Sequence, residues 1–296
     1  MHTDFQNPRW LRDLLRFIPL KSQFVLFGNV RDLQASEIAP SVVTPLPFNQ
    51  SLFNSLFKAG YAYALTYTPL VGFQCLANPA QDAQETEAVM QRLGLNITEG
   101  KAAGGIDMLN HLLERLIQDK QEPIALCIDF ASCLISHHDN LTPAEHSLFT
   151  RALVASHQSK ARPAGQHHQP FYNTVFWIVE KETDLPDWFV INNPRIRAIP
   201  VAKPDGQVRR LLAQSLLGSL VDFNGIEEAD KPQIINDFVD ETEGLLLLDL
   251  TAIVQLARIE QVPAASIRDA VRRYKVGITE DPWKKLISKK FIMLQL

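Results

Sequence analysis

The stretch PIALCIDF, Pro123–Phe130, decides the fold class of this 296-residue chain. It is an unbroken apolar run that ends in an acidic residue, Asp129. Strands that are buried on both faces of a parallel sheet are apolar along their whole length, whereas half-exposed strands alternate. We therefore predict a central strand of a parallel sheet with Asp129 at its end.

Similar short apolar runs occur on both sides of this strand, and stretches with helical periodicity separate them. Thr142 begins one such helix, because Thr-Pro-Ala-Glu is a capping box with proline in the first turn. Strands that alternate with helices indicate a three-layer α/β domain with a parallel five-stranded sheet. The other predicted strands are Gln23–Gly28, Tyr61–Tyr67, Asn173–Glu180 and Arg195–Val201, and the main helices are Ser51–Gly60, Gly105–Lys120 and Thr142–His157.

The pattern changes after Pro204, where helical stretches follow one another without strands. We predict an α/β domain at 1–203, a small all-helical domain at 204–276 and a basic tail or linker at 277–296. The four helical stretches are Gln207–Leu220, Pro232–Asp240, Leu245–Glu260 and Ala264–Tyr274.

Composition bounds the class of protein. An apolar content of 46% is enough for one large or two modest domains. The net charge of −4 gives no global field that would recruit nucleic acid. The chain has no 18-residue apolar run and starts with polar residues, so we expect a cytoplasmic protein without a membrane partner. The three cysteines form no C-x-x-C pair, which fits reduced structural thiols.

The apolar strand that ends at Asp129 resembles the Walker B element of AAA+ ATPases. The segment Thr242–Glu260 resembles a helix of the AAA+ lid, with matches at Thr242, Gly244, Asp249 and Leu250. The resemblance covers roughly residues 20–275 and implies an AAA+-like α/β domain followed by a helical lid. Further family-like elements follow in the family's order: Asp184-Leu185-Pro186, Ile199-Pro200-Val201, Pro204 and Arg209-Arg210.

The departures from the AAA+ pattern concern the nucleotide site. A phosphate loop should follow Gln23–Gly28, but the segment 29–50 contains neither glycine nor a Gly-Lys pair. Phe130 follows Asp129 where hydrolysis requires a residue that positions water. An acidic cluster, Glu180-Lys181-Glu182, replaces the polar tip of sensor 1. The resemblance thus implies a degenerate module, similar to the N-terminal half of two-module AAA+ proteins, that does not hydrolyse ATP alone.

One stretch imitates the missing loop. In GLNITEGKA, Gly94–Ala102, five residues rather than four separate the two glycines, and Ala102 replaces the hydroxyl residue that would hold Mg²⁺. The stretch before it reads as a helix, not a strand. We expect an exposed loop tip, which leaves Lys101 as a weak candidate for phosphate contact. The expected apolar side of the preceding helix comprises Ala88, Met90, Leu93 and Leu95.

Few residues remain as site candidates. Asp129 either binds Mg²⁺ or accepts hydrogen bonds from a neighbouring loop. Arg195 and Arg197 flank the fifth strand, where AAA+ rings carry an arginine that reaches the next subunit, so they are candidate interface residues or a plain surface pair. The histidines match no metal motif, and we assign no metal site and no catalytic residue.

Three functional hypotheses stay open. The first is a structural, regulatory or oligomerisation unit whose partners are AAA+ subunits or a downstream AAA+ module, in which case this chain is a fragment. The second is an ATP-binding AAA+ ATPase with a non-standard phosphate site, which would use ATP and Mg²⁺. The third is a module for a protein partner or nucleic acid. Its candidate phosphate contacts are Arg272, Arg273, Lys284 and Lys285, which equally fit a solvated linker.

Overall fold

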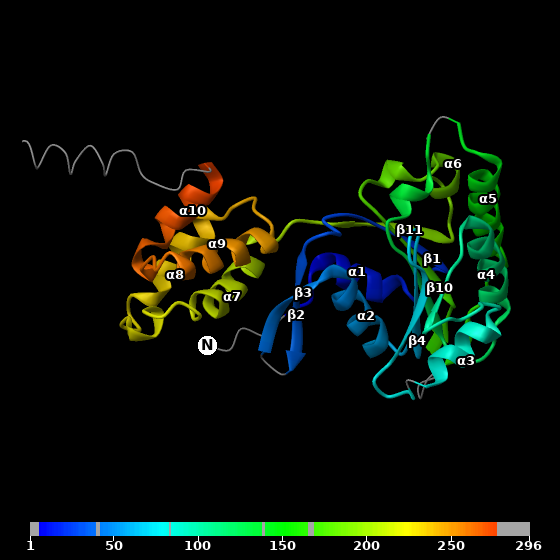
Figure 1. Ribbon diagram of the computed structural model, residues 1–296, viewed down its shortest axis with the longest axis horizontal. Coiled ribbons are helices and arrows are strands. Elements are labelled where there is room, and N and C mark those ends of the chain that lie inside the picture. The colour runs from blue at the N-terminus through cyan, green and yellow to red at the C-terminus, as the bar shows by residue number, and fades with distance from the viewer. Residues whose placement is uncertain (1–5, 40–41, 83, 138–139, 165–168, 277–296) are drawn as a thin grey trace, which may run out of the picture. The chain divides into compact units, whose positions relative to one another are not determined.

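The computed structural model describes residues 6–39, 42–82, 84–137, 140–164 and 169–276 (Figure 1). The tail predicted at 277–296, with Lys284 and Lys285, lies outside these residues. The chain forms two compact units. We call their described residues the α/β unit, within Asn7–Arg31 and Pro47–Ala202, and the helical unit, which comprises Gln6 and residues 32–39, 42–46 and 203–276.

A seven-stranded sheet forms the centre of the α/β unit, in the order β11-β1-β10-β7-β4-β5-β6. All five residues of β7 are buried, and Leu126 pairs with Val175 on one side and Leu65 on the other. The five predicted parallel strands are confirmed: β1 (Gln23–Gly28), β4 (Tyr63–Thr68), β7 (Ile124–Ile128), β10 (Thr174–Val179) and β11 (Ile196–Val201).

The sheet also carries two antiparallel strands that the sequence did not reveal, β5 (Gly72–Ala77) and β6 (Lys101–Ala102). A separate two-stranded sheet is formed by β8 (Arg162–Ala164) and β9 (Gln169–Phe171). Strands β6, β8 and β9 have only two or three residues each, and β5 has six but is only partly buried, so no continuous apolar run marks any of them.

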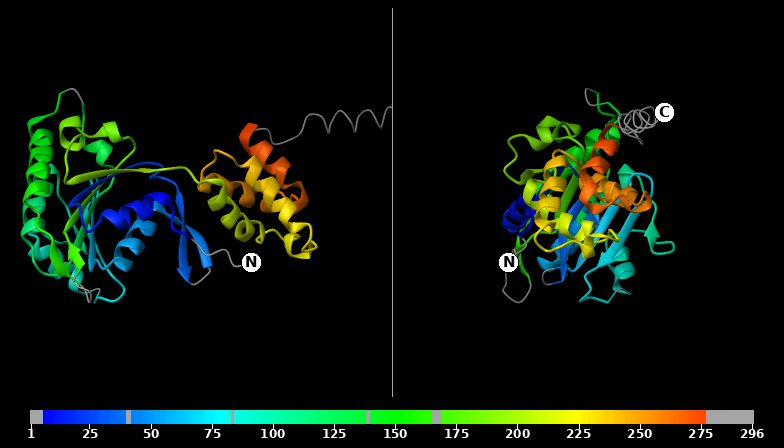
Figure 2. Two further views of the ribbon diagram at one scale, coloured as in Figure 1. Left: turned by 180° about the vertical axis from the view of Figure 1, so that it is seen from behind. Right: turned by 90° about the vertical axis from the view of Figure 1, so that its left-hand side faces the viewer.

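Helices cover both faces of the sheet, as Figure 2 shows from two further directions. Side chains of alternate residues point to opposite faces of a strand, so Phe24 and Val25 belong to different clusters. One face packs on α1 (Arg9–Phe17) and α2 (Phe48–Lys58). The other packs on α3 (Glu85–Arg92), α4 (Ile106–Gln118), α5 (Pro143–Gln158) and the short α6 (Asp187–Val190). The three-layer α/β architecture is confirmed.

Local signals within these helices gave mixed results. The capping box at the start of α5 is present, with Thr142 N–H donating to Glu145 Oε2 at 2.8 Å. The expectation that Ala88 lies on the apolar side of α3 is wrong, because Ala88 is exposed and Val89 and Met90 are buried instead. Met90, Leu93 and Leu95 were assigned to the buried side correctly.

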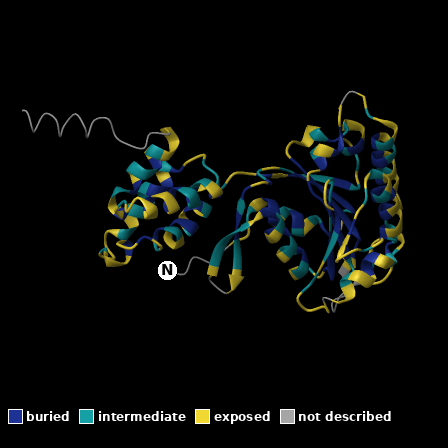
Figure 3. Ribbon diagram, in the orientation of Figure 1, coloured by how far each residue is buried: buried dark blue, intermediate teal, exposed yellow. Residues whose placement is uncertain are grey.

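The helical unit contains α7 (Gly206–Leu217), α8 (Lys231–Glu241), α9 (Leu247–Ile259) and α10 (Ile267–Val276). It also contains two strands from the first part of the chain, β2 (Leu33–Ala39) and β3 (Val42–Pro47). Ala35 of β2 is buried in the same cluster as Leu212 and Phe238. Figure 3 colours the ribbon of each unit by burial. The segment Asp32–Leu46 thus belongs to the helical unit, although it lies inside the stretch 1–203 that the sequence assigned to the α/β domain.

Short 3₁₀ turns join several elements: η1 (Ala131–Leu134), η2 (Glu182–Asp184), η3 (Phe223–Gly225) and η4 (Ala264–Ser266). Within the described residues, no helix combines the length and apolar character that a membrane crossing requires.

Candidate functional site

Asp129 lies directly after β7, at the carboxyl end of the parallel strands. Its backbone N–H donates to Tyr67 O at 2.9 Å, which continues the sheet pairing by one residue. Phe130 then turns the chain with φ of +52°, and its N–H donates to Asp129 Oδ1 at 2.8 Å. The strand end therefore holds the Asp129 carboxylate in place, with 10% of its side chain exposed.

Arg31 makes an ion pair with this carboxylate. Its Nη1 donates to Asp129 Oδ1 at 2.5 Å, and its Nε donates to Glu180 Oε1 at 2.7 Å. The guanidinium carbon lies 3.7 Å from the centre of the Phe130 ring, which is cation–π distance. Burial lowers the pKa of Arg31, but the hydrogen bonds and charges of Asp129 and Glu180 outweigh it and raise the pKa above its usual value. The guanidinium stays charged between two carboxylates.

Asn49 occupies the other oxygen of Asp129. It lies in the first turn of α2, and its Nδ2 donates to Asp129 Oδ2 at 2.6 Å. Its own Oδ1 is buried and has no hydrogen-bond partner within the described part of the chain. Both carboxylate oxygens of Asp129 therefore have protein donors. We call Arg31, Asn49, Asp129, Phe130 and Glu180 the carboxylate site.

The turn after β10 positions Glu180. Its N–H donates to Ser132 Oγ at 3.0 Å, and Ser132 Oγ donates to Asp184 Oδ2 at 2.7 Å. The N–H of Lys181 donates to the same Asp184 oxygen at 2.8 Å. The acidic cluster at the end of β10 thus supplies a partner for Arg31. The sequence analysis identified Asp129 and Glu180 but not Arg31 and Asn49. These two residues lie in the segment 29–50, which has no phosphate-loop motif.

The stretch that imitates a phosphate loop is a tight turn. Thr98 N–H donates to Lys101 O at 2.7 Å, and Lys101 N–H donates back to Thr98 O at 3.1 Å. Glu99 and Gly100 both have positive φ, +52° and +73°, as a two-residue hairpin turn requires. Lys101 is exposed and is not part of the carboxylate site. The N–H groups of Thr98 and Lys101 are therefore used in hydrogen bonds within the turn.

The two arginines beside the fifth strand have different surroundings. The Arg197 guanidinium stacks on the Phe17 ring of α1, 4.1 Å from its centre, and its Nε is buried. Arg195 is partly exposed, and its carbonyl accepts a hydrogen bond from Gln23 N–H at 3.4 Å. Neither residue is part of the carboxylate site. A role at a subunit interface stays a prediction for both.

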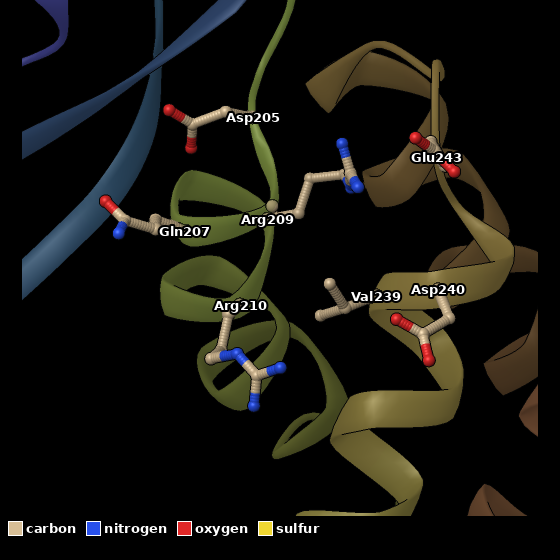
Figure 4. Close-up of a pocket in the computed structure, with 8 residues that line it drawn as sticks. Asp205, Gln207, Arg209, Arg210, Val239, Asp240 and Glu243 are labelled. Atoms are coloured by element: carbon tan, nitrogen blue, oxygen red, sulfur yellow. The ribbon is translucent and has the colours of Figure 1, made fainter.

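A pocket of about 730 Å³ lies in the helical unit, between the first turn of α7 and the end of α8 (Figure 4). Arg209 extends across it toward Glu243 in this view, and its Nη1 donates to Pro204 O at 2.9 Å. The lining mixes two arginines with three carboxylates, so it offers no net attraction for an anion. The lining residues are Asp205, Gly206, Gln207, Arg209, Arg210, Val239, Asp240 and Glu243.

The described arginines of the nucleic-acid hypothesis face acidic partners. Arg272 Nη2 lies 3.0 Å from Glu241 Oε1, and Arg273 Nη1 lies 3.7 Å from Glu260 Oε2. The hydrogen bond from Arg272, together with that from Arg268, lowers the pKa of Glu241 and keeps it ionised. Each of these two arginines therefore lies beside a carboxylate of the helical unit.

The AAA+ resemblance implies ATP with Mg²⁺, and the carboxylate site does not fit them. Magnesium prefers oxygen ligands such as Asp129 and Glu180, but the Arg31 guanidinium binds both of these carboxylates. Asn49 holds the remaining Asp129 oxygen. In the described part of the chain, no three His, Cys, Asp or Glu side chains gather as a potential metal site.

Comparison with known proteins identifies a family for the α/β unit. Residues 4–202, more than half of the chain, match the family described as AAA+ chaperone, N-terminal Rossmann-like domain. No curated protein matches the chain. A chain from the structure of the E. coli MS115-1 HORMA:CdnC:Trip13 complex is 12% identical with a TM-score of 0.48, covering 88% of this chain and 77% of its own length. The family match shows that this chain belongs to the AAA+ chaperone family with an N-terminal Rossmann-like domain.

Proposed function

We propose that this chain is an AAA+ module that does not hydrolyse ATP alone and serves as a structural, regulatory or oligomerisation unit. Its partners would be AAA+ subunits or a downstream AAA+ module in the cytoplasm. The observation that supports the proposal is that both oxygens of the Asp129 carboxylate accept hydrogen bonds from protein groups. Arg31 donates to one oxygen and Asn49 donates to the other.

The bound guanidinium opposes metal binding. A cation at Asp129 would have to displace Arg31 from two charge-assisted hydrogen bonds, which are about twice as strong as neutral ones. Alternatively it would have to bind beside a positive charge that is always present. Phosphoryl transfer depends on the placement of a metal ion and of charges around the phosphates. A guanidinium in the position of the metal ion would therefore prevent it.

The segment after β1 also lacks a phosphate cradle. A phosphate loop offers several backbone N–H groups to the ligand. Here Gly28 N–H donates to Glu180 O at 3.1 Å and Asn29 N–H to Val201 O at 2.8 Å. Val30 N–H donates to Gly28 O at 2.8 Å. Three consecutive donors are thus directed to protein acceptors.

Nucleotide titration tests the proposal. The full chain is titrated with a fluorescent ATP analogue and Mg²⁺, with Asp129→Asn and Lys101→Ala measured in parallel. We expect no binding up to millimolar nucleotide in any of the three proteins. Micromolar binding that Asp129→Asn abolishes would overturn the proposal and favour an ATPase with a remodelled site. Binding that only Lys101→Ala abolishes would place the phosphates at the Thr98–Lys101 turn.

A second titration tests the stated cause. Arg31→Ala removes the guanidinium and leaves Asp129, Glu180 and Asn49 as oxygen donors. We expect this variant to bind Mn²⁺, followed by electron paramagnetic resonance, more tightly than the unmodified chain. The double variant Arg31→Ala, Asp129→Asn should lose that gain. Equal Mn²⁺ binding by the unmodified chain and Arg31→Ala would show that the arginine does not block a metal.

A further inference from the structure

The pocket between α7 and α8 has two walls of opposite charge (Figure 4). Its lining residues all belong to the helical unit, so the site lies within one unit. One wall is formed by the first residues of α7, which include Arg209 and Arg210. The other is the end of α8, where Asp240 lies in the last turn and Glu243 follows the helix. The volume of about 730 Å³ lies within the range of pockets that bind small ligands.

Arg209 is a buried cation without a carboxylate partner. Only 8% of the residue is exposed, and its guanidinium extends across the pocket (Figure 4). Its Nη1 donates to Pro204 O at 2.9 Å, whereas its Nε has no acceptor within the described residues. None of the ion pairs that the described residues form involves Arg209. Because a buried charge is costly unless it is paired, this guanidinium favours an anionic ligand group.

The carboxylates of the opposite wall also lack partners. Asp240 and Glu243 are exposed, and neither side chain forms an ion pair or a hydrogen bond with the described part of the chain. Glu241, between them in the sequence, instead binds Arg268 and Arg272. The pocket therefore separates an unpaired buried cation from two unpaired carboxylates.

The helix ends add to this separation of charge. The amino end of a helix carries partial positive charge and the carboxyl end partial negative charge. The pocket lies at the amino end of α7, which begins at Gly206, and at the carboxyl end of α8, which ends at Glu241. Asp205 offsets part of the positive end, because its Oδ1 caps α7 by accepting from Val208 N–H at 2.9 Å. A ligand with a single charge is attracted by one wall and repelled by the other, whereas both walls attract a ligand that carries both charges.

We propose that this pocket binds a small zwitterion of about tripeptide size. The carboxylate of the ligand lies at Arg209 and Arg210, and its ammonium group lies at Asp240 and Glu243. Charge-assisted hydrogen bonds then form at both walls, and the ligand neutralises the Arg209 guanidinium. The site goes beyond the proposed function, since it involves neither Asp129 nor a nucleotide.

Three tripeptides test the proposal on the full chain. Trialanine carries both charges, N-acetyltrialanine only the carboxylate, and trialanine amide only the ammonium group. Binding is followed by proton–nitrogen NMR spectra at the amides of Gly206 and Val239, which line the pocket. We expect trialanine to bind about tenfold more tightly than either blocked peptide, because hydrogen bonds between charged groups contribute more than neutral ones.

Variants assign each charge of the ligand to its wall. Glu243→Gln should weaken trialanine binding about tenfold and leave N-acetyltrialanine unchanged. Arg210→Gln should weaken trialanine binding but leave trialanine amide unchanged. Arg209→Gln should act in the same way, and the exposed Arg210 serves in its place should loss of the buried side chain disturb folding. Glu227→Gln and Arg258→Gln are the matched controls, because both residues are exposed in the same unit and lie outside the pocket lining.

Several outcomes would overturn the proposal. They are equal affinity for the three peptides, equal losses in the control variants, and a dissociation constant for trialanine above about 10 mM. Tighter binding of one blocked peptide would mean that a single wall binds the ligand, which contradicts the assignment to a zwitterion. No nucleotide enters these titrations, so their failure would leave the proposed function standing.

Discussion

Two stretches of this chain differ in how they relate to a phosphate loop. The Thr98–Lys101 turn resembles the loop in its amino-acid sequence, whereas the segment 28–48 occupies the position of the loop after the first strand. The turn contains Gly100 and Lys101 but closes on itself at an exposed position. The segment follows the first strand of the sheet, and its Arg31 binds the Asp129 carboxylate. The position of a stretch in the fold, rather than its similarity to a sequence motif, determines which stretch meets the carboxyl ends of the parallel strands.

The segment 28–48 differs from a loop that binds phosphate because its residues make structural contacts. Some of these contacts lie in the α/β unit and others in the helical unit. Arg31 neutralises the acidic strand ends of the α/β unit, while Asp32 and Ala35 complete the helical unit. Substitutions in this segment should therefore cost stability, whereas substitutions in the Thr98–Lys101 turn should cost little.

The largest effect is expected for Asp32→Ala. It leaves the first two N–H groups of α9 without their acceptor, one of them in a buried position. Loss of a helix cap costs about 1 kcal/mol, and each buried donor left unsatisfied adds roughly 1–3 kcal/mol. We expect about 3 kcal/mol less stability for the helical unit, measured by urea unfolding. Asp205→Ala removes the exposed cap of α7 and should cost only about 1 kcal/mol.

Replacing a glycine with alanine in each stretch gives a matched pair. Gly28 has φ of +99°, and a Cβ there would lie 2.8 Å from the carbonyl oxygen of Val201, which is backbone of β11. Gly100 has φ of +73°, but a Cβ there would meet no atom within 4 Å. We expect Gly28→Ala to lower the free energy of unfolding by about 2–3 kcal/mol and Gly100→Ala by about 1 kcal/mol. Equal losses in thermal or urea unfolding would contradict the assigned close approach.

Removing one positive charge from each stretch gives a second pair. Arg31→Gln breaks two charge-assisted hydrogen bonds and leaves Asp129 largely buried, so we expect a loss of about 1–2 kcal/mol after allowance for the part of Arg31 that is exposed. Lys101→Gln changes an exposed turn residue and should stay within about 0.5 kcal/mol. A larger loss for Lys101→Gln would mean that the turn has an unrecognised structural role.

The smallest expected effect is the pH dependence of the Arg31 contribution. The pKa of Arg31 is raised in the folded state, so its stabilisation is fully present below the ordinary arginine pKa and is lost only as pH rises through the raised value. We expect the stability difference between the unmodified chain and Arg31→Gln to be the same at about pH 6 and about pH 9. A difference that shrinks over this range would show that another group controls the pair.

Much of the fold could be predicted from the sequence, because the relevant signals are local. Continuous apolar runs such as Ile124–Ile128 are typical of strands buried on both faces, and β7 and β10 follow this pattern along their whole length. The other three parallel strands were predicted from shorter apolar runs, and β11 also contains Arg197. The Thr142 capping box marks a helix start within four residues. Strand β6 was missed because it has only two residues, and β5 was missed because it is partly exposed and contains Gln74, so it is not a continuous apolar run.

The sequence also determined that no Gly-Lys motif follows the first strand and that Asp129 ends a central strand. Only the tertiary structure decided what replaces the loop, since the contacts involved span long separations. Arg31 meets Asp129 across 98 residues, and Asp32 meets α9 across 215. Hydrophobic periodicity reports which face of an element is buried, but it does not report which distant charge faces a buried carboxylate. That pairing depends on strand order and on the path of the chain between the two units.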